Sequence, residues 1–583
     1  MLSTLTILMA AGKPAGGAPA QDLVPAAIGG ALLTAVVLAV GLGHRSGRVK
    51  LIARAATLAE RVVPVPGWAA LPVLVTLASL AVAAFGFFWD VATHIDDGRD
   101  SGPFANVAHY PILAGLAGIT LAGFLAAVLG ADARDRAALP WAPGWRIPLG
   151  GALLLLCGGL AMVGFPLDDV WHRIFGQDVT LWGPTHVLMI GGASLAPIAA
   201  WLLLVEGRCA TGRTGSGRPA LLAWEVQLAG ATLTGLSTLQ LEFDYGVPQF
   251  ALDFHPILIA LAASVGLVAA RVRLGRGGAL AAVAAYLLII TPMVLVVGPG
   301  FGHTFMHFPL YVAEALLVEL AALSRRGPLG TGVIAGALIG TVGVAAEWAW
   351  TQVAMPLAWN AALLPQAPLL ALVAALAGGV IGAHLGGALR APGRPLGLPR
   401  LLPAAAVVVI IACLAIPMRT EPGPPVRASV TLDGDREALA TVKFDPPQAA
   451  QGAKWLHVMS WQGGGSHLVQ LRQVAPGTYR TSQPVPVDGD WKTMVRLHKD
   501  NHILALPIYL PGDAAIPANE VPARPHFARA FQVDHEILRR EERGAASWLT
   551  GAAYGTLAAV ALAWLVAIGA AVTRFERRST VLA

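Results

Sequence analysis

FWDVATHIDDGRDSGPFANVAHYPIL, residues 88–113, lies where one long apolar segment ends and the next begins, and it carries a regular polar pattern. His94 follows Asp90 by four residues, and Asp100 comes six residues later. His109 opens the next apolar run nine residues after Asp100. The stretch therefore gathers acids and histidines between two apolar segments.

The same pattern returns in residues 167–189, LDDVWHRIFGQDVTLWGPTHVLM. Asp168, His172 and Asp178 repeat the intervals of four and six residues, and His186 opens the following apolar run after eight residues. This repetition indicates an internal repeat of helical pairs. We interpret the chain as a membrane scaffold that holds two acid–histidine clusters at one surface.

The composition is that of a polytopic all-α membrane protein. Of the 583 residues, 56% are hydrophobic and 13% are charged, whereas soluble globular proteins carry about 25% charged residues. The net charge of +6 does not indicate nucleic-acid binding, because the arginines fall in short loops, as orientation signals do. The three cysteines, Cys157, Cys209 and Cys413, are scattered, which excludes a disulfide framework and a CxxC metal site.

About thirteen apolar segments are long enough to span a bilayer, which requires about 20 residues each. We expect twelve of them in a membrane domain at residues 1–420 and the last in residues 547–583, which end in a basic tail. The predicted spans lie near residues 25–43, 68–89, 108–130, 147–165, 185–205, 219–241, 252–270, 278–298, 304–323, 330–350, 363–388, 400–418 and 547–572.

The loops between these spans predict the orientation in the membrane. Arginine-rich loops alternate with loops that hold only Arg99 and Arg173 between the first and eleventh spans. Because cytoplasmic loops are enriched in Lys and Arg, the arginine-rich set is predicted to be cytoplasmic. We therefore expect a multi-pass protein of a bacterial plasma membrane, with an extracytoplasmic N-terminus and a cytoplasmic C-terminus.

Residues 421–515 have a different character. Short alternating runs, among them ASVTL and HLVQLRQV, are separated by turn signals such as LDGD and APGTY. This pattern predicts an extracytoplasmic, immunoglobulin-like β-sandwich. Residues 516–546 are polar and charged, and we interpret them as a linker to the last span.

The repeated clusters carry the predicted chemistry. An acid and a histidine spaced i, i+4 on a helix lie on one face, and a histidine that opens the next helix can complete a metal site across the hairpin. Two imidazoles and a carboxylate suit copper, iron or zinc; the alternative is that these side chains are helix caps or solvated loop residues. The predicted metal ligands form two trios: Asp90, His94, His109 and Asp168, His172, His186.

Further acids and histidines are weaker candidates. Asp244 and His255 resemble a partial third copy, and His303 and His307 are spaced i, i+4 in GHTFMHFP, which reads equally well as a capped helix start. Inside the ninth span, two glutamates are candidates for a proton path, or alternatively for helix packing through buried hydrogen bonds. These glutamates are Glu314 and Glu319.

Residues 168–189 resemble the metal-binding segment of the C subunit of particulate methane and ammonia monooxygenases. That segment also has an Asp, a His four residues later, a second Asp, and a short element ending in His that opens a helix, matched here by residues 183–186, GPTH. The resemblance implies that Asp168, His172 and His186 are copper ligands. A second acid–His–His site of that subunit implies the same for the trio that begins at Asp90.

The β domain is a second point of resemblance. Its pattern from VAPGTYR to PVDGDWKTMVRLH is similar to FixH/YtkA-type extracytoplasmic domains, which are often found beside copper-handling membrane proteins. Trp455, His457 and Met459 alternate onto one face, and without a cysteine they cannot form a blue-copper site. The other interpretation is a structural or docking module.

The leading functional prediction is a copper-dependent monooxygenase, or a subunit of one, that oxidises a small substrate; zinc and iron are the alternative metals. The second prediction is a non-enzymatic protein for copper handling or metal transport, in which the β domain is a chaperone or docking module. The third is a structural subunit of a respiratory complex. The expected partners are the lipid bilayer, a small-molecule substrate, and other membrane subunits or further copies of the chain, but not nucleic acid.

Overall fold

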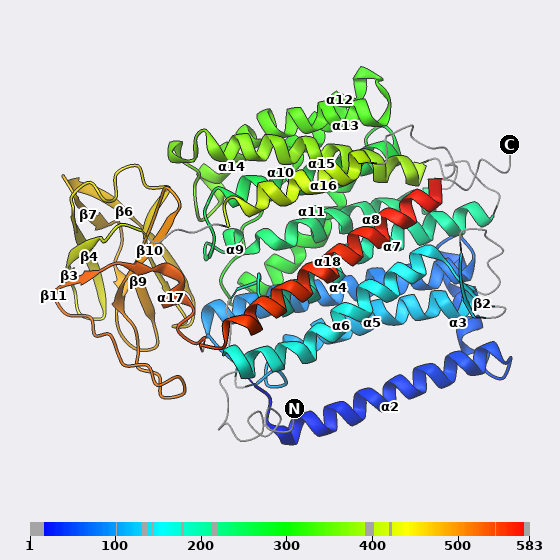
Figure 1. The fold of residues 1–583 in the computed structure, drawn as a ribbon, viewed down its shortest axis with the longest axis horizontal. Helices are drawn as coiled ribbons and strands as arrows, with labels where there is room; N and C mark the ends of the chain where they lie inside the picture. The colour runs from blue at the N-terminus through cyan, green and yellow to red at the C-terminus, as the bar shows by residue number, and fades with distance from the viewer. Residues whose placement is uncertain are drawn as a thin grey trace.

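The computed structural model describes residues 17–100, 102–130, 138–142, 145–176, 180–211, 219–390, 401–418, 423–542 and 544–576. In this part of the chain, a bundle of long helices carries a separate β-sheet domain at one end (Figure 1). Asp178 and several arginines of the basic loops lie outside the described residues. The architecture is thus an α-helical membrane domain joined to a β domain.

The helical elements follow the apolar segments of the sequence. They are α2 (Ala20–Arg45), α3 (Leu51–Val62), α4 (Gly67–Asp96), α5 (His109–Leu129), α6 (Leu149–Phe175), α7 (Pro184–Ala210), α8 (Pro219–Ser237), η2 (Thr238–Gln240), α9 (Leu241–Asp244), α10 (Phe254–Leu274), α11 (Gly278–Leu295), η3 (Val296–Gly300), α12 (Val312–Ala321), η4 (Ala322–Ser324), α13 (Gly327–Leu338), η5 (Ile339–Gly343), α14 (Val344–Ala354), η6 (Ala361–Leu363), α15 (Gln366–Arg390), α16 (Leu401–Ala415) and α18 (Ser547–Glu576).

Ten helical segments of the described chain are long and apolar enough to cross a membrane. They coincide with ten of the thirteen predicted spans and indicate a multi-pass protein in contact with a lipid bilayer. The three other predicted spans correspond to α8, α12 and α16, which do not meet that criterion of length and composition. The predicted span at 304–323 is partly wrong, because residues 303–311 are not helical and α12 begins only at Val312.

Two helical hairpins, α4–α5 and α6–α7, hold the two acid–histidine patterns at the same end of the bundle. α4 has 30 residues and is therefore about 45 Å long, longer than the ~30 Å hydrocarbon core. Its last turns, with Asp90 and His94, can thus project toward the membrane surface. The helices of the first hairpin pack closely at Gly86, where an added Cβ would lie 2.9 Å from the carbonyl oxygen of Ala108.

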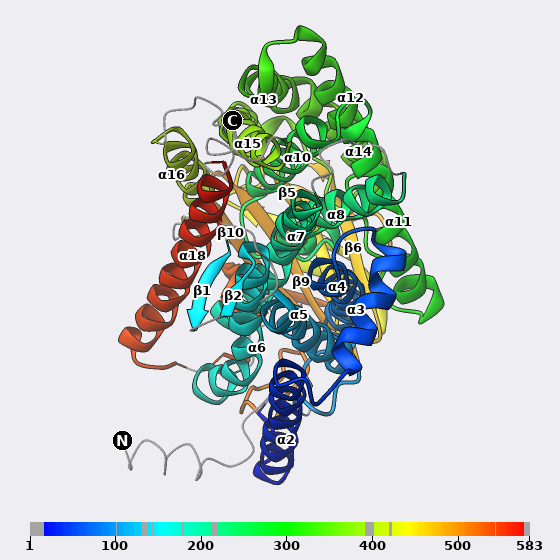
Figure 2. The same ribbon diagram turned by 90° about the vertical axis from the view of Figure 1, so that its right-hand side faces the viewer.

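Seen along the bundle, the helices surround the central α7, while α2, α16 and α18 lie at the periphery (Figure 2). In the central part of α2, no residue is buried within the protein. An apolar helix with so little protein contact faces lipid. A small two-stranded sheet, β1 (Leu139–Ala142) and β2 (Trp145–Ile147), lies at the end opposite the β domain (Figure 1).

The β domain is one path of paired strands in the order β11-β3-β4-β7-β6-β5-β9-β10-β12, with β8 paired to β4. Buried residues from both halves of this path share one hydrophobic core. The strands are β3 (Arg427–Asp433), β4 (Glu437–Asp445), β5 (Trp455–Trp461), β6 (Ser466–Ala475), β7 (Thr478–Thr481), β8 (Val485–Pro486), β9 (Lys492–Lys499), β10 (His502–Tyr509), β11 (His526–Ala530) and β12 (Gln532–Val533).

The segment predicted as a linker, residues 516–546, is more structured than expected. It contributes the edge strands β11 and β12 and the short helix α17 (Asp534–Leu538). These strands were not predicted because β11 and β12 have only five and two residues, and β11 has no buried residue that would give an alternating apolar pattern. The β domain therefore extends beyond residue 515.

The β domain docks on the cluster end of the bundle through charged and backbone contacts. Lys454 Nζ lies 2.5 Å from Asp253 Oδ2, and the backbone N–H of Gln462 donates to the carbonyl of Ile95 in α4 at 3.0 Å. Arg99 pairs with Asp513 at 2.9 Å. These contacts place the β domain directly over the end of α4.

Candidate metal centres

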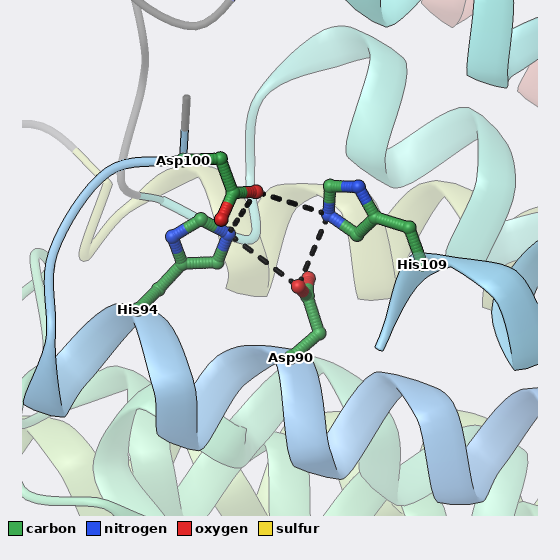
Figure 3. Close-up of side chains that lie close together, drawn as sticks. All are labelled: Asp90, His94, Asp100 and His109. Atoms are coloured by element: carbon green, nitrogen blue, oxygen red, sulfur yellow. Dashed lines mark ion pairs between the residues drawn. The ribbon is translucent and has the colours of Figure 1, made fainter. Parts of the chain in front are cut away.

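The first cluster consists of Asp90 and His94 on α4, Asp100 in the following loop, and His109 at the start of α5 (Figure 3). Asp90 Oδ1 lies 3.4 Å from His94 Nε2 and 3.0 Å from His109 Nε2. Asp100 Oδ2 lies 3.4 Å and 3.5 Å from the same two nitrogens. The four side chains thus come from three segments of the chain, α4, the following loop and α5, and converge on one point.

Both imidazole rings of this cluster are oriented by the backbone. Nδ1 of His94 lies 2.8 Å from the carbonyl oxygen of Gly98, and Nδ1 of His109 lies 2.8 Å from that of Pro103. Because a carbonyl only accepts hydrogen bonds, each Nδ1 carries the proton. In the neutral ring, Nε2 then directs a lone pair at carboxylate oxygens, so a proton or a metal cation between them is required. Metal-bound histidines usually have this outer-sphere arrangement.

Asn106 is a part of the site that the sequence analysis missed. Its Nδ2 donates to Asp90 Oδ1 at 2.6 Å and to Asp100 Oδ2 at 3.1 Å, while its Oδ1 accepts from the backbone N–H of Ala108 at 2.9 Å. The amide therefore holds both carboxylates against the start of α5. Its only sequence signal is a polar side chain within the first repeat.

The second cluster repeats the design with Asp168 and His172 on α6 and His186 on α7. His186 Nε2 lies 3.4 Å from Asp168 Oδ1, and His172 Nε2 lies 3.8 Å from Asp168 Oδ2. His186 Nδ1 lies 2.7 Å from the carbonyl oxygen of Thr180, and Thr185 Oγ1 donates to Asp168 Oδ1 at 2.6 Å. The Thr185 hydroxyl thus holds the carboxylate of Asp168, as the Asn106 amide holds that of Asp90 in the first cluster.

The structure therefore brings together the members of both predicted trios. In each cluster, the potential ligand atoms lie within 4.8 Å of one another, and the first cluster adds Asp100 to its trio. Two donors bound to one ion at the ~2.0–2.2 Å of metal–nitrogen and metal–oxygen bonds lie at most about 4.4 Å apart, so a small inward movement of the side chains lets each cluster hold an ion. Asp178, the counterpart of Asp100, lies outside the described residues.

Both clusters open into the same cavity, which has a volume of about 540 Å³. Phe165, three residues before Asp168, lines this cavity, with its ring centroid 6.1 Å from that of His109 in an edge-to-face arrangement. The β domain closes part of the cavity with Met459, Trp461 and Gln462. Most of the wall is apolar and includes Leu77, Leu80, Phe87, Ile112, Met189 and Ile190.

Glu242 on α9 is a further acid of this cavity that the sequence analysis missed. It is 3% exposed, and its Oε1 accepts from Thr180 Oγ1 at 2.7 Å and from the Leu181 backbone N–H at 2.8 Å. Burial raises the pKa of Glu242, against the effect of these hydrogen bonds. It therefore orders the Thr180 loop whose carbonyl orients His186.

The weaker metal candidates do not join either cluster. Asp244 and His255 form a buried pair, with 3.6 Å between Oδ1 and Nε2. His303 pairs instead with Asp96 at 2.9 Å, and the backbone N–H of His307 donates to the Asp244 carbonyl at 3.1 Å. Because residues 303–311 are irregular rather than helical, the i, i+4 spacing does not place the two histidines on one face.

The proton-path candidates, Glu314 and Glu319, are not among the residues that line the shared cavity. Glu319 Oε2 pairs with Arg271 at 2.7 Å, and its Oε1 accepts from the backbone N–H of Ala279 near the start of α11 at 3.0 Å. Glu319 thus connects α12 with α10 and with the start of α11, and its role in a proton path stays a prediction. Glu314 lies elsewhere, beside Glu347.

The alternating face of β5 is a docking face. All of β5 is buried, and Arg496 of the neighbouring β9 donates to the carbonyl of Pro248 in the membrane domain at 2.5 Å. His457 and His498 on this face are fully buried. Their burial lowers the pKa of both rings well below 6.5, and the charge of Arg496 lowers both further.

Comparisons of the chain with models of protein families, with curated proteins and with solved structures found no match. The fold and the clusters define the class of the molecule in their own right: a multi-pass helical membrane protein with a β-sheet domain at one end. Between the two parts lie two Asp/His clusters and their common cavity.

Proposed function

We propose that the protein is a copper-dependent membrane monooxygenase, or a subunit of one, that oxidises a small apolar molecule. The observation that carries this proposal is the single, mostly apolar cavity into which both Asp/His clusters open. Ligand sites are typically concave and apolar, with a few converging polar groups that fix orientation. A cavity of about 540 Å³ admits a small molecule beside both clusters.

The donor sets support a transition metal. Each cluster combines two imidazole nitrogens with carboxylate oxygens, a mixture that suits copper, iron or zinc better than hard cations, which prefer all-oxygen ligation. The resemblance of residues 168–189 to the monooxygenase segment favours copper among them. The additional carboxylate of Asp100 gives the first cluster one more negative charge, which favours a divalent ion there.

A bound copper centre would supply oxygen activation. In the overall reaction, one C–H bond of the substrate becomes C–OH, one oxygen atom of O₂ leaves as water, and a membrane reductant supplies two electrons and two protons. The chain's own residues orient the imidazoles, exclude water and bind the substrate. Phe165, beside His109, and the apolar walls formed by α4 and α7 hold an apolar molecule close to the ligands.

The competing function, copper handling or metal transport, needs ligands that continue across the bilayer. Away from the clusters, the described cavity lining on α8 and η2 offers Gln227, Thr234 and Thr238, but neither acids nor histidines. This distribution favours a site over a pathway. Within this proposal, α8, α12 and α16 complete a set of thirteen membrane segments, and the β domain is of the immunoglobulin-like class.

For the orientation, we propose that the clusters and the β domain are extracytoplasmic, in a plasma membrane. α10 begins near the β domain, where the Leu252 backbone N–H donates to His498 Nδ1 at 3.4 Å. It then runs 21 residues, so Arg271 lies at the opposite end, together with Arg325 and Arg390. Arginine enrichment at that end marks it as cytoplasmic.

Loss of the histidines should remove the metal without unfolding the bundle. We expect His109→Ala and His172→Ala each to lower copper content and the double variant to lower it further, because each change removes a ligand of one cluster. The measurement is metal content by mass spectrometry on detergent-purified protein, with His467→Ala, an exposed histidine of the β domain, as control. Equal copper in the wild type and the double variant would reject the metal sites.

A second variant separates metal binding from substrate binding. Ala193→Phe on α7 places a ring in the cavity, so oxidation of a small hydrocarbon with O₂ should fall while copper content stays unchanged. Ala114→Phe, on the exposed face of α5, is the control and should keep activity. Full activity in Ala193→Phe would show that the reaction does not use this cavity.

A further inference from the structure

A second polar centre lies in the other half of the membrane domain, apart from the lining of the metal cavity. Glu314, in the first turn of α12, and Glu347, in α14, are 1% and 4% exposed. Two acids buried at membrane depth are costly and usually functional. The fold brings them together from two different helices.

The surroundings offer these carboxylates very little compensation. Neither oxygen of Glu314 and only one of the two oxygens of Glu347 has a hydrogen-bond partner within the described part of the chain. The charged groups that act on Glu347 are Glu314 and Asp244, which are both acids. The only group that favours the ionised form of Glu314 is its own backbone. No described cation therefore neutralises the pair.

Two ionised carboxylates in such a site would repel each other and would both lack solvation. When two acids occupy one buried site, one of them retains its proton, and the pair titrates as a unit. We propose that Glu314 and Glu347 share one proton and form a proton-binding site inside the membrane domain. This site does not involve the metal ligands, so the proposal does not depend on the proposed oxidation.

Two backbone features lie next to the glutamate pair: an irregular segment before α12 and a glycine, Gly343, opposite Glu314. The irregular segment 303–311 interrupts the helical structure before α12, and non-helical backbone at membrane depth is tolerated only inside protein or along a cavity. Opposite Glu314 lies Gly343, at the end of η5, where an added Cβ would be 3.3 Å from both Cγ and Oε1 of Glu314. A larger residue at 343 would press on the carboxyl group.

Polar groups connect this pair toward the β-domain side. Glu347 interacts with the backbone of Tyr311, and the Tyr311 hydroxyl accepts from Ser237 at 2.9 Å and lies 3.3 Å from Gln240 Oε1. Asp244 acts electrostatically on both Glu347 and Tyr311. Tyr286, packed against Tyr311 with 5.4 Å between ring centroids, is the remaining titratable neighbour.

His255 is the last of the polar groups that lead from the glutamate pair toward the β domain. Trp359 Nε1 donates to its Nδ1 at 3.2 Å, so in the neutral ring the proton is on Nε2, which is directed at Asp244 Oδ1 at 3.6 Å. Both of these facing atoms lack another hydrogen-bond partner in the described structure. Asp244 and His255 therefore form the step through which the shared proton can exchange with the β-domain side.

Infrared difference spectroscopy on the detergent-purified full-length protein tests the shared proton. At neutral pH we expect a protonated-carboxyl C=O band that shifts in D₂O and is lost or displaced in both Glu314→Gln and Glu347→Gln. Glu319→Gln is the matched control, because Glu319 is one and a half turns along the same helix but pairs with Arg271. It should leave the band unchanged.

Three outcomes would overturn the proposal. The first is a wild-type protein without the band at neutral pH, which means that both acids are ionised. The second is a band that survives in both glutamine variants, which assigns the proton to another group. The third is a band that appears only when sodium and potassium are removed, which means that the pair holds a metal cation. Copper content, measured in parallel, should be the same in all these variants.

Discussion

At the scale of single residues, the direction of the imidazoles decides what the clusters can bind. His94, His109 and His186 each direct Nδ1 at a backbone carbonyl, at 2.7 to 2.8 Å. This contact fixes the tautomer and leaves Nε2 for an ion. Without this contact with a carbonyl, the neutral ring could carry its proton on Nε2 and donate an ordinary hydrogen bond to the carboxylate. The carbonyls of the loops are thus as much a part of the sites as the ligands.

Asn106 supports both carboxylates of the first cluster, so its loss should weaken that site. In a His172→Ala background, which disables the second cluster, we expect Asn106→Ala to lower metal affinity by about 10- to 100-fold, as is typical for outer-sphere partners. Calorimetric titration with the metal measures this change. Asp97→Ala, an exposed acid of the same loop, should have little effect, and equal losses in the two variants would contradict a specific role for Asn106.

At the scale of elements, the clusters depend on how closely the paired helices approach. α4 and α5 meet at glycines, and an added Cβ at Gly86 would lie 2.8 Å from the backbone nitrogen of Ile112. Small residues at helix interfaces allow such contact in membranes. Because Gly86 is one turn before Asp90 and opposite the residues that flank His109, the same contact sets the geometry of the first cluster.

Gly86→Val should therefore separate the first hairpin and selectively impair the first cluster. We expect about half of the metal to be lost and the free energy of unfolding to fall by about 1–3 kcal/mol, the usual cost of overpacking. Gly159→Val on α6 is the matched control, because no atom lies within 4 Å of the added Cβ. Metal analysis and thermal melting provide the measurements, and full metal content in Gly86→Val would contradict this packing argument.

At the scale of the whole molecule, the β domain lines part of the cavity and is held to the bundle by one buried and one partly exposed ion pair. Lys454–Asp253 and Arg99–Asp513 join the two parts at 2.5 Å and 2.9 Å, and Arg496 pairs with Asp534 at 2.6 Å within the docking face. The buried histidines of this face, His457 and His498, lie among these cations. Their protonation would add like charge to a fully buried site.

Docking should therefore weaken in acid. The folded pKa values of His457 and His498 lie well below 6.5, so below that pH the unfolded state binds more protons, and the stability contribution of the two rings is lost as pH falls. Each histidine contributes a slope of about 1.4 kcal/mol per pH unit in this window. Thermal melting between pH 5 and 8 should show the slope.

The paired control for this pH effect is His457→Phe/His498→Phe, which cannot take up protons at either position. Its melting temperature should depend less on pH below the ordinary histidine pKa of about 6.5 than that of the wild type. An unchanged pH dependence in this double variant would assign the acid sensitivity to other groups.

Features that depend on local spacing can be predicted from the amino-acid sequence of this protein. Apolar runs of bilayer length predicted ten of the helices found, and the i, i+4 spacing placed Asp90 with His94 and Asp168 with His172 on common helix faces. Alternating short runs predicted the β domain, apart from its last strands. These features follow from helix and strand geometry, which repeats every few residues.

The surroundings that the clusters and the acids share could not be predicted in this way, because they depend on the three-dimensional packing. The common cavity depends on the packing of α4, α6 and α7 and on the position of the β domain. The pairing of Glu314 with Glu347 depends on α12 and α14 meeting in space, and the support by Asn106 depends on the conformation of a loop. Such contacts join residues with no fixed spacing along the chain. They result from close packing between helices and sheet, which no local pattern encodes.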